Sequence, residues 1–101
     1  MPQRYRSFRE FYPFYLSEHA DRTCRRLHFA GTSLVIGCVV AAFTTANAWW
    51  LAAAPVAGYG FAWVGHFAFE RNRPATFTYP LYSLIGDWVM YKDMLVGRIP
   101  F

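Results

Sequence analysis

Apolar residues are spread unevenly along the chain and predict a long pair of helices in its middle. A 43-residue block, 27–69, contains no Asp, Glu, Lys or Arg. About 20 helical residues cross a hydrocarbon core of roughly 30 Å, so this block is long enough for two crossings. We predict spans at 27–43 and 49–69, separated by a short polar turn at 44–48. Spans that lie so close in sequence form an antiparallel hairpin.

A segment with helical periodicity precedes this block. Its apolar stripe ends at a histidine and consists of Phe8, Phe11, Tyr12, Tyr15 and His19. We expect Pro13 to interrupt this helix or to start a second one at Tyr12-Pro13, because proline lacks the backbone N–H that a helix interior uses. Asp21 and Thr23 are the candidate N-caps of the next helix.

Another helical segment follows the block. Asn72-Arg73-Pro74 stops the second span, and Tyr79-Pro80 starts a new element. Its apolar face consists of Leu81, Leu84, Ile85, Trp88 and Leu95, which predicts an amphipathic helix lying at a membrane surface. The predicted fold class is all-α. We expect a small integral membrane protein with one domain, 1–101, in which an antiparallel two-span helical hairpin is flanked by an N-terminal helix and a C-terminal amphipathic helix.

Composition supports a membrane protein over a soluble one. The 101 residues are 55% hydrophobic, 21% aromatic and 16% charged, which argues against disorder. A soluble domain of this size buries too small a fraction of its surface to hide 43 uncharged residues. The mean hydropathy is only +0.13, because the spans are rich in Ala, Gly and Thr. A soluble helical bundle that oligomerises is therefore the alternative.

The basic residues predict the orientation in the membrane. Six arginines precede the first span, and three arginines and one lysine follow the second, whereas the connecting turn has none. By the positive-inside rule both termini face the cytoplasm, and Trp49 and Trp50 lie at the far interface. No cleavable signal peptide is visible, and we expect a bacterial inner membrane. Cys24 and Cys38 are expected to be free thiols.

The same charges and the small residues limit the partners. A net charge of +4 suits an anionic membrane surface. No recognised nucleic-acid motif accompanies the arginines, so we expect no nucleic-acid partner. Small residues on the helix faces make a homodimer possible.

Three histidines are the main candidates for chemistry. His19 precedes the first span, His28 lies near its start, and His66 lies near the end of the second span. An antiparallel hairpin brings His28 and His66 to one depth, with His19 close above them. Glu70 follows His66 by four residues and shares its helix face. Two or three histidines with a carboxylate suit Fe(II) or Zn(II), although interfacial histidines and a Glu70–Arg73 pair are the alternative.

Three segments carry a resemblance to a known family. They are Phe-Tyr-Pro-Phe-Tyr-Leu-Ser-Glu-His at 11–19, Arg-Leu-His-Phe-Ala-Gly-Thr at 26–32, and Gly-His-Phe-Ala-Phe-Glu-Arg-Asn-Arg-Pro-Ala-Thr at 65–76. Together they resemble the family called domain of unknown function 962. Its characterised fungal members are endoplasmic-reticulum dioxygenases of 2-hydroxy fatty acid α-oxidation. The likeness covers nearly the whole chain, with Glu18-His19 standing where the fungal members carry a His-His pair.

The resemblance implies a non-haem Fe(II)-dependent dioxygenase that uses O₂ to remove one carbon from long-chain 2-hydroxy fatty acids. It implies that His19, His28 and His66 hold the iron. Glu70, the candidate catalytic carboxylate, would orient a ligand imidazole or bind the iron directly.

Four arginines are candidates for gripping the substrate carboxylate, for which a guanidinium fork is suited. They are Arg25, Arg26, Arg71 and Arg73. The acyl tail would lie between the spans or in the surrounding lipid. Two other classes stay open: a haem-binding electron-transfer protein, with His28 and His66 clamping the haem, and a non-catalytic membrane scaffold with interfacial histidines.

Overall fold

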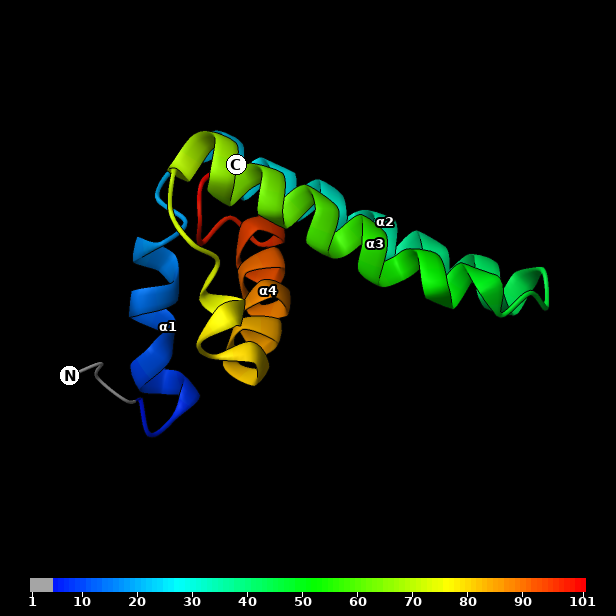
Figure 1. Cartoon of the computed structure of the whole chain (residues 1–101), viewed down its shortest axis with the longest axis horizontal. Coiled ribbons are helices and arrows are strands. Elements are labelled where there is room, and N and C mark those ends of the chain that lie inside the picture. Colours follow the sequence, from blue (N-terminus) through cyan, green and yellow to red (C-terminus); the bar gives the residue numbers. More distant parts are fainter. Residues whose placement is uncertain (1–4) are drawn as a thin grey trace.

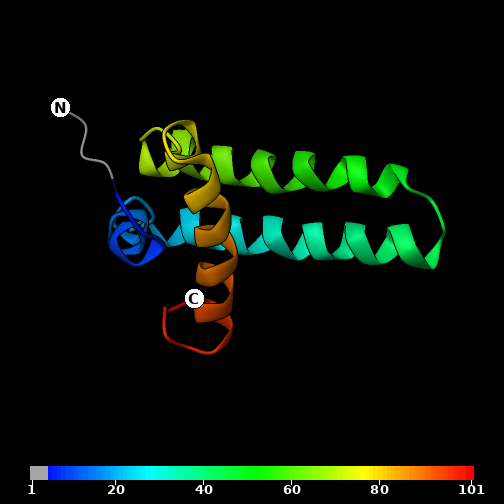
Figure 2. The ribbon, with the colours of Figure 1, turned by 90° about the horizontal axis from the view of Figure 1, so that it is seen from below.

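The computed structural model describes residues 5–101, and these form helices joined by short connections (Figure 1). In chain order the elements are α1 (Phe8–Ser17), α2 (Arg22–Thr44), α3 (Trp49–Val64), the π-helix η1 (Gly65–Glu70), the 3₁₀ turn η2 (Ala75–Phe77) and α4 (Pro80–Leu95). Figures 1 and 2 show α2 and α3 side by side as a long hairpin, with α1 and α4 at the end opposite its connecting turn. The predicted all-α class is confirmed.

The first predicted span lies within α2. The carboxylate of Asp21 accepts the backbone N–H of Cys24 at 3.0 Å, which confirms one of the two predicted N-caps. Among the residues that the structure describes, α2 is the one helix long and apolar enough to cross a membrane. The second predicted span, 49–69, is divided, because the backbone changes from α-helix to π-helix after Val64. The α-helical part has 16 residues, fewer than the about 20 that cross a bilayer, and a second span is not shown.

Small residues bring the two arms of the hairpin together near its open end. A Cβ on Gly31 would lie 3.0 Å from Cβ of Phe61 and 3.3 Å from the carbonyl oxygen of Gly58. The backbones therefore approach closely here, as small residues allow. Farther along the hairpin, large apolar side chains point outward, with Phe43 and Trp49 each 81% exposed.

Helix α1 runs unbroken through Pro13, so the predicted interruption is wrong. The helix begins after Ser7, whose side chain accepts the N–H of Glu10. Proline removes one backbone hydrogen bond from the helix. Phe11 and Tyr15, however, are 0% and 1% exposed and belong to the main hydrophobic cluster. Packing of these two rings against α4 stabilises the helix across the proline.

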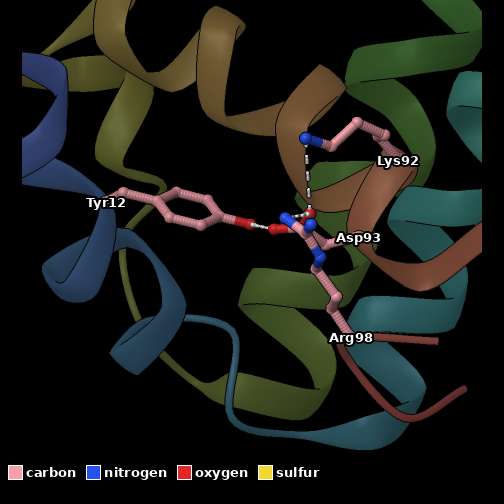
Figure 3. Close-up of polar contacts among 4 residues, drawn as sticks. All are labelled: Tyr12, Lys92, Asp93 and Arg98. Carbon is pink, nitrogen blue, oxygen red and sulfur yellow. Dashed lines mark hydrogen bonds and ion pairs between the residues drawn. The ribbon is translucent and has the colours of Figure 1, made fainter. Parts of the chain in front are cut away.

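A polar contact also joins α1 to α4, as Figure 3 shows. The hydroxyl of Tyr12 donates to Oδ2 of Asp93 at 2.8 Å, while Lys92 and Arg98 lie 3.7 and 4.0 Å from Oδ1. Burial and the adjacent carboxylate raise the pKa of Tyr12, so it stays a proton donor. This contact and the aromatic cluster fix α1 beside α4.

Helix α4 begins at Pro80, as predicted, and crosses the hairpin near its open end (Figure 2). The apolar side chains of its predicted face are all exposed, from Ile85 at 38% to Leu81 at 66%. The opposite face buries Ser83, Gly86, Met90, Asp93 and Met94. This buried face of α4 packs against α1, α2 and η2.

Candidate metal centre

His19 lies in the turn between α1 and α2 and is held by the last turn of α1. Its ring stacks on that of Tyr15, with 4.0 Å between centroids, and its Nδ1 lies 2.6 Å from the Tyr15 carbonyl oxygen. A carbonyl oxygen only accepts hydrogen bonds, so Nδ1 carries the proton and Nε2 keeps a free lone pair. Burial, together with the neighbouring ring of His28, lowers the pKa of His19 well below its usual range. The ring is therefore neutral at pH 7.

His28 repeats this hydrogen-bonding pattern on α2. Its Nδ1 lies 2.8 Å from the carbonyl oxygen of Cys24, one helical turn earlier, and 3.7 Å from the Cys24 sulfur. Nδ1 is again the hydrogen-bond donor, so Nε2 is unprotonated and keeps its lone pair. This Nε2 lies 3.1 Å from Nε2 of His19.

His66 reaches the other two rings because η1 lies directly against the start of α2. A Cβ on Gly65 would lie 3.0 Å from Sγ and 3.2 Å from Cα of Cys24, so glycine is needed for this approach. Nδ1 of His66 lies 2.7 Å from Oδ1 of Asn72. The amide of Asn72 is oriented by its Nδ2, which donates to the Glu18 carbonyl oxygen at 3.1 Å. His66 is thus the third ring with a protonated Nδ1.

The local backbone explains why Asn72 reaches His66. The π-helix ends at Glu70 and is followed by Arg71, which has a left-handed φ of 57°. The N–H of Asn72 bonds to the His66 carbonyl oxygen at 3.0 Å. The chain therefore turns back, with the Asn72 side chain beside the imidazole. Turns of π-helix are rare and often occur at functional sites.

The three imidazoles form one buried cluster. Their centroids lie 4.4 Å (His19–His28), 4.5 Å (His19–His66) and 4.9 Å (His28–His66) apart, and one ring nitrogen of each lies within 4.8 Å of the others. The predicted grouping of His19, His28 and His66 is confirmed.

These residues fit a metal ion. Two nitrogen lone pairs 3.1 Å apart repel unless a cation lies between them. Nitrogen–metal bonds of about 2.1 Å put two neighbouring ligands roughly 3.0 to 3.4 Å apart in octahedral or tetrahedral geometry. Neutral imidazoles whose second nitrogen donates to an oxygen are the usual protein arrangement at such sites. The cluster could therefore hold a divalent metal through three nitrogen ligands.

The other predicted site residues lie around the cluster. Glu70 is outside the group of three possible ligands, and its carboxylate accepts the backbone N–H of Asp21 at the start of α2. Arg25 donates to the carbonyl oxygens of His19 and Ala20 at 3.2 and 2.8 Å. Its contacts thus close the turn that carries His19.

The remaining three arginines are exposed. Arg26 donates to the carbonyl oxygen of Phe101 at 2.8 Å and lies over its ring, and Arg73 lies over the ring of Phe77. Arg71 forms the turn after the π-helix. Within residues 5–101, the hydrogen bonds and ring contacts of these arginines do not include an imidazole of the cluster.

Sequence reasoning missed the polar residues of α4 beside the cluster. Tyr15 donates to Oδ1 of Asp87, and Ser83 lies one turn before Asp87 on the same face. Burial raises the pKa of Asp87 to about 6, and burial with the adjacent carboxylate raises that of Tyr15 well above its usual range. The spacing of Ser83 and Asp87, opposite the apolar face of α4, was the available signal.

Two cavities that share lining residues adjoin the histidines. A small one, of about 10 Å³, lies among the three imidazoles, Ser83 and Asp87. A larger one, of about 290 Å³, extends between α2, α3 and α4 and is mainly apolar, with Pro55 and Trp88 in its wall. His28 and Asp87 line both cavities. A ligand with a polar head and an apolar tail matches this pair of spaces.

Fold and site together define a small helical protein with a buried three-histidine centre that could hold a metal ion. Residues 5–99 match the family model described as 2-hydroxy-palmitic acid dioxygenase Mpo1-like. The chain belongs to this Mpo1-like family, and the resemblance seen in the sequence is confirmed. No curated protein and no solved structure matches the chain significantly.

Proposed function

We propose that this protein is an Fe(II)-dependent dioxygenase that shortens long-chain 2-hydroxy fatty acids by one carbon. One observation carries the proposal: three buried imidazoles converge with their Nδ1 atoms engaged by oxygens and their Nε2 lone pairs free. The family description supplies the class of substrate. Three nitrogen ligands suit iron and leave coordination positions open.

In this proposal iron supplies the activation of O₂ and the cleavage of the bond between carbons 1 and 2. His19, His28 and His66 hold the ion, and Asn72 fixes the tautomer of His66. Glu70 is proposed to act as a positioning residue, because its carboxylate ties the end of η1 to the start of α2. The 290 Å³ cavity takes the first part of the acyl chain, and the rest extends into lipid.

The four arginines stay a prediction for binding the substrate carboxylate. Arg25 is the best placed of them, since it bonds to the carbonyl oxygen of His19. A homodimer also stays a prediction.

We further propose that both arms of the hairpin cross a bacterial inner membrane, with both termini in the cytoplasm. Helix α2 is by itself long and apolar enough to cross a membrane, whereas α3 would cross it together with η1. The outward-facing apolar side chains support lipid contact, because soluble monomers rarely expose such large apolar surfaces. The exposed apolar face of α4 would lie at the cytoplasmic interface.

A haem-binding protein is disfavoured by the packing. The three imidazoles contact one another, and the cavity among them measures about 10 Å³, which leaves no space for a porphyrin between His28 and His66. A non-catalytic scaffold gives no reason for three lone pairs to meet in a buried cluster.

Metal analysis of detergent-purified protein, followed by turnover, tests the proposal. We expect about one iron per chain, lost in His28→Ala and in His66→Ala. The variant Asn47→Ala, in the hairpin turn, should keep the iron. Wild-type protein with Fe(II) and O₂ should convert 2-hydroxypalmitate to the acid one carbon shorter. Trace metal that is the same in all variants, or no product above the metal-free background, would contradict the proposed function.

A further inference from the structure

Ser83 is a buried hydroxyl without a hydrogen-bond partner in the described part of the chain. The residue is 2% exposed and lies in the wall of the small cavity that the three histidines also line. Serine within a helix commonly bonds back to the carbonyl four residues earlier. Here that carbonyl, of Tyr79, accepts the backbone N–H of Ser83 at 2.9 Å, and the hydroxyl stays unpaired. Such orphaned groups in native structures call for a ligand or an ordered water.

Asp87 lies one helical turn after Ser83 and is fixed in place by α1. The hydroxyl of Tyr15 donates to its Oδ1, and the ring of Tyr15 stacks on His19. Gly86 makes this possible, since a Cβ there would lie 2.9 Å from two carbon atoms of the Tyr15 ring. Asp87 lines both cavities, so it lies beside the apolar space and also beside the space at the imidazoles.

The two side chains offer complementary hydrogen-bonding groups. A serine hydroxyl can donate to a carboxylate, whereas an ionised aspartate only accepts. At neutral pH the carboxyl of Asp87 is mainly ionised, because burial raises its pKa only to about 6. An ionised acceptor in the wall of both cavities disfavours an unsubstituted acyl chain and favours one that carries a hydroxyl donor near its head.

We propose that Ser83 and Asp87 are the specificity-determining residues of the site, with Ser83 Oγ donating to the substrate carboxylate and Asp87 accepting from the 2-hydroxyl. This inference rests on the proposed function for the class of substrate. Neither residue contributes to the group of possible metal ligands, so their role can be measured as binding in protein without iron. The apolar tail then lies in the larger cavity, beside Trp88.

Equilibrium binding of 2-hydroxypalmitate and of palmitate tests the proposal, with quenching of tryptophan fluorescence as the readout. The full chain in lipid nanodiscs is titrated after iron removal by a chelator, and again with iron. For the wild type we expect 2-hydroxypalmitate to bind about tenfold more tightly than palmitate in both states, the effect of one hydrogen bond to a charged group. Asp87→Asn should reduce this ratio towards one. Ser83→Ala should weaken both acids by about tenfold and leave the ratio unchanged.

A matched control and a rescue keep the result interpretable. Ser33→Ala removes another part-buried serine hydroxyl, which lies 3.0 Å from the Tyr91 hydroxyl away from the cluster, and should bind both acids as the wild type does. Ser83→Thr keeps a hydroxyl and should restore most of the affinity. Iron content equal to that of the wild type shows that each variant is folded.

The outcomes separate this inference from the proposed function. Preference for 2-hydroxypalmitate that disappears in Asp87→Asn supports the inference even if the protein shows no turnover. Wild-type binding without preference, no binding of either acid, or Ser83 and Asp87 variants that bind like Ser33→Ala would overturn it, even if the enzyme shortens 2-hydroxypalmitate.

Discussion

Asn72 offers the sharpest test of how the histidine cluster is held. Its side chain makes three contacts: Oδ1 with His66 Nδ1 at 2.7 Å, and Nδ2 with the carbonyl oxygen and the carboxylate of Glu18 at 3.1 and 3.4 Å. The first contact fixes the tautomer of His66, and the other two tie η1 to the turn that carries His19. Asn72→Ala removes all three contacts.

The expected size of the effect follows from these contacts. Loss of a partner that orients a metal-binding histidine lowers metal affinity by about 10- to 100-fold. Loss of three partly buried hydrogen bonds lowers the free energy of unfolding by roughly 1 to 3 kcal/mol. Asn72→Asp separates the two effects, because aspartate still accepts from His66 Nδ1 but cannot donate to Glu18. We expect it to keep iron affinity within a few-fold of the wild type while losing stability.

Iron affinity is measured by competition with a chromophoric chelator, and stability by thermal unfolding of the iron-free protein. Asn47→Ala is the matched control, since Asn47 lies in the hairpin turn and its side chain accepts the Trp49 N–H at 3.0 Å. Wild-type iron affinity in Asn72→Ala, or equal loss of affinity in the Ala and Asp variants, would refute the role assigned to the amide oxygen.

Three further predictions concern packing, pH and topology. Gly86→Ala places a methyl group 2.9 Å from the Tyr15 ring and should lower the free energy of unfolding by about 1 to 3 kcal/mol in thermal melts; unchanged stability would contradict the tight packing. Burial raises the pKa of Asp87 from 3.8 to about 6, so the folded state binds the extra proton and wild-type stability should fall by about 2 kcal/mol as pH rises from 4 to 6. Asp87→Asn should lack that contribution, and parallel curves for both proteins would refute it. In a background without the native cysteines, Asn47→Cys should react with a membrane-impermeant maleimide only from the periplasmic side, and labelling from the cytoplasmic side would reverse the proposed orientation.

Much of the fold was predictable because its signals are local. The uncharged block, the Asp21 cap and the Pro80 start each act through a few neighbouring residues, and all three features occur in the structure. Pro13 was misjudged because the packing of distant α4 against Phe11 and Tyr15 compensates for a local defect. The division of the second span at Gly65 was missed as well.

The sequence allowed us to predict which histidines form the candidate site. It did not allow us to predict the hydrogen bonds that orient their rings. Their grouping followed from the antiparallel hairpin alone. The hydrogen bonds that leave each Nε2 free come from Tyr15, Cys24 and Asn72, and the last of these depends on the left-handed turn at Arg71. No spacing in the sequence indicates that turn.

The sequence by itself determined that the chain is helical, that its middle is apolar, and that its three imidazoles gather at one end of a hairpin, because helical periodicity and charge distribution are properties of neighbouring residues. Only the tertiary structure decided which nitrogen of each ring is free and that Ser83 and Asp87 face the cluster. Those features depend on where α1, η1 and α4 pack against one another, and that packing joins residues more than fifty positions apart in the chain.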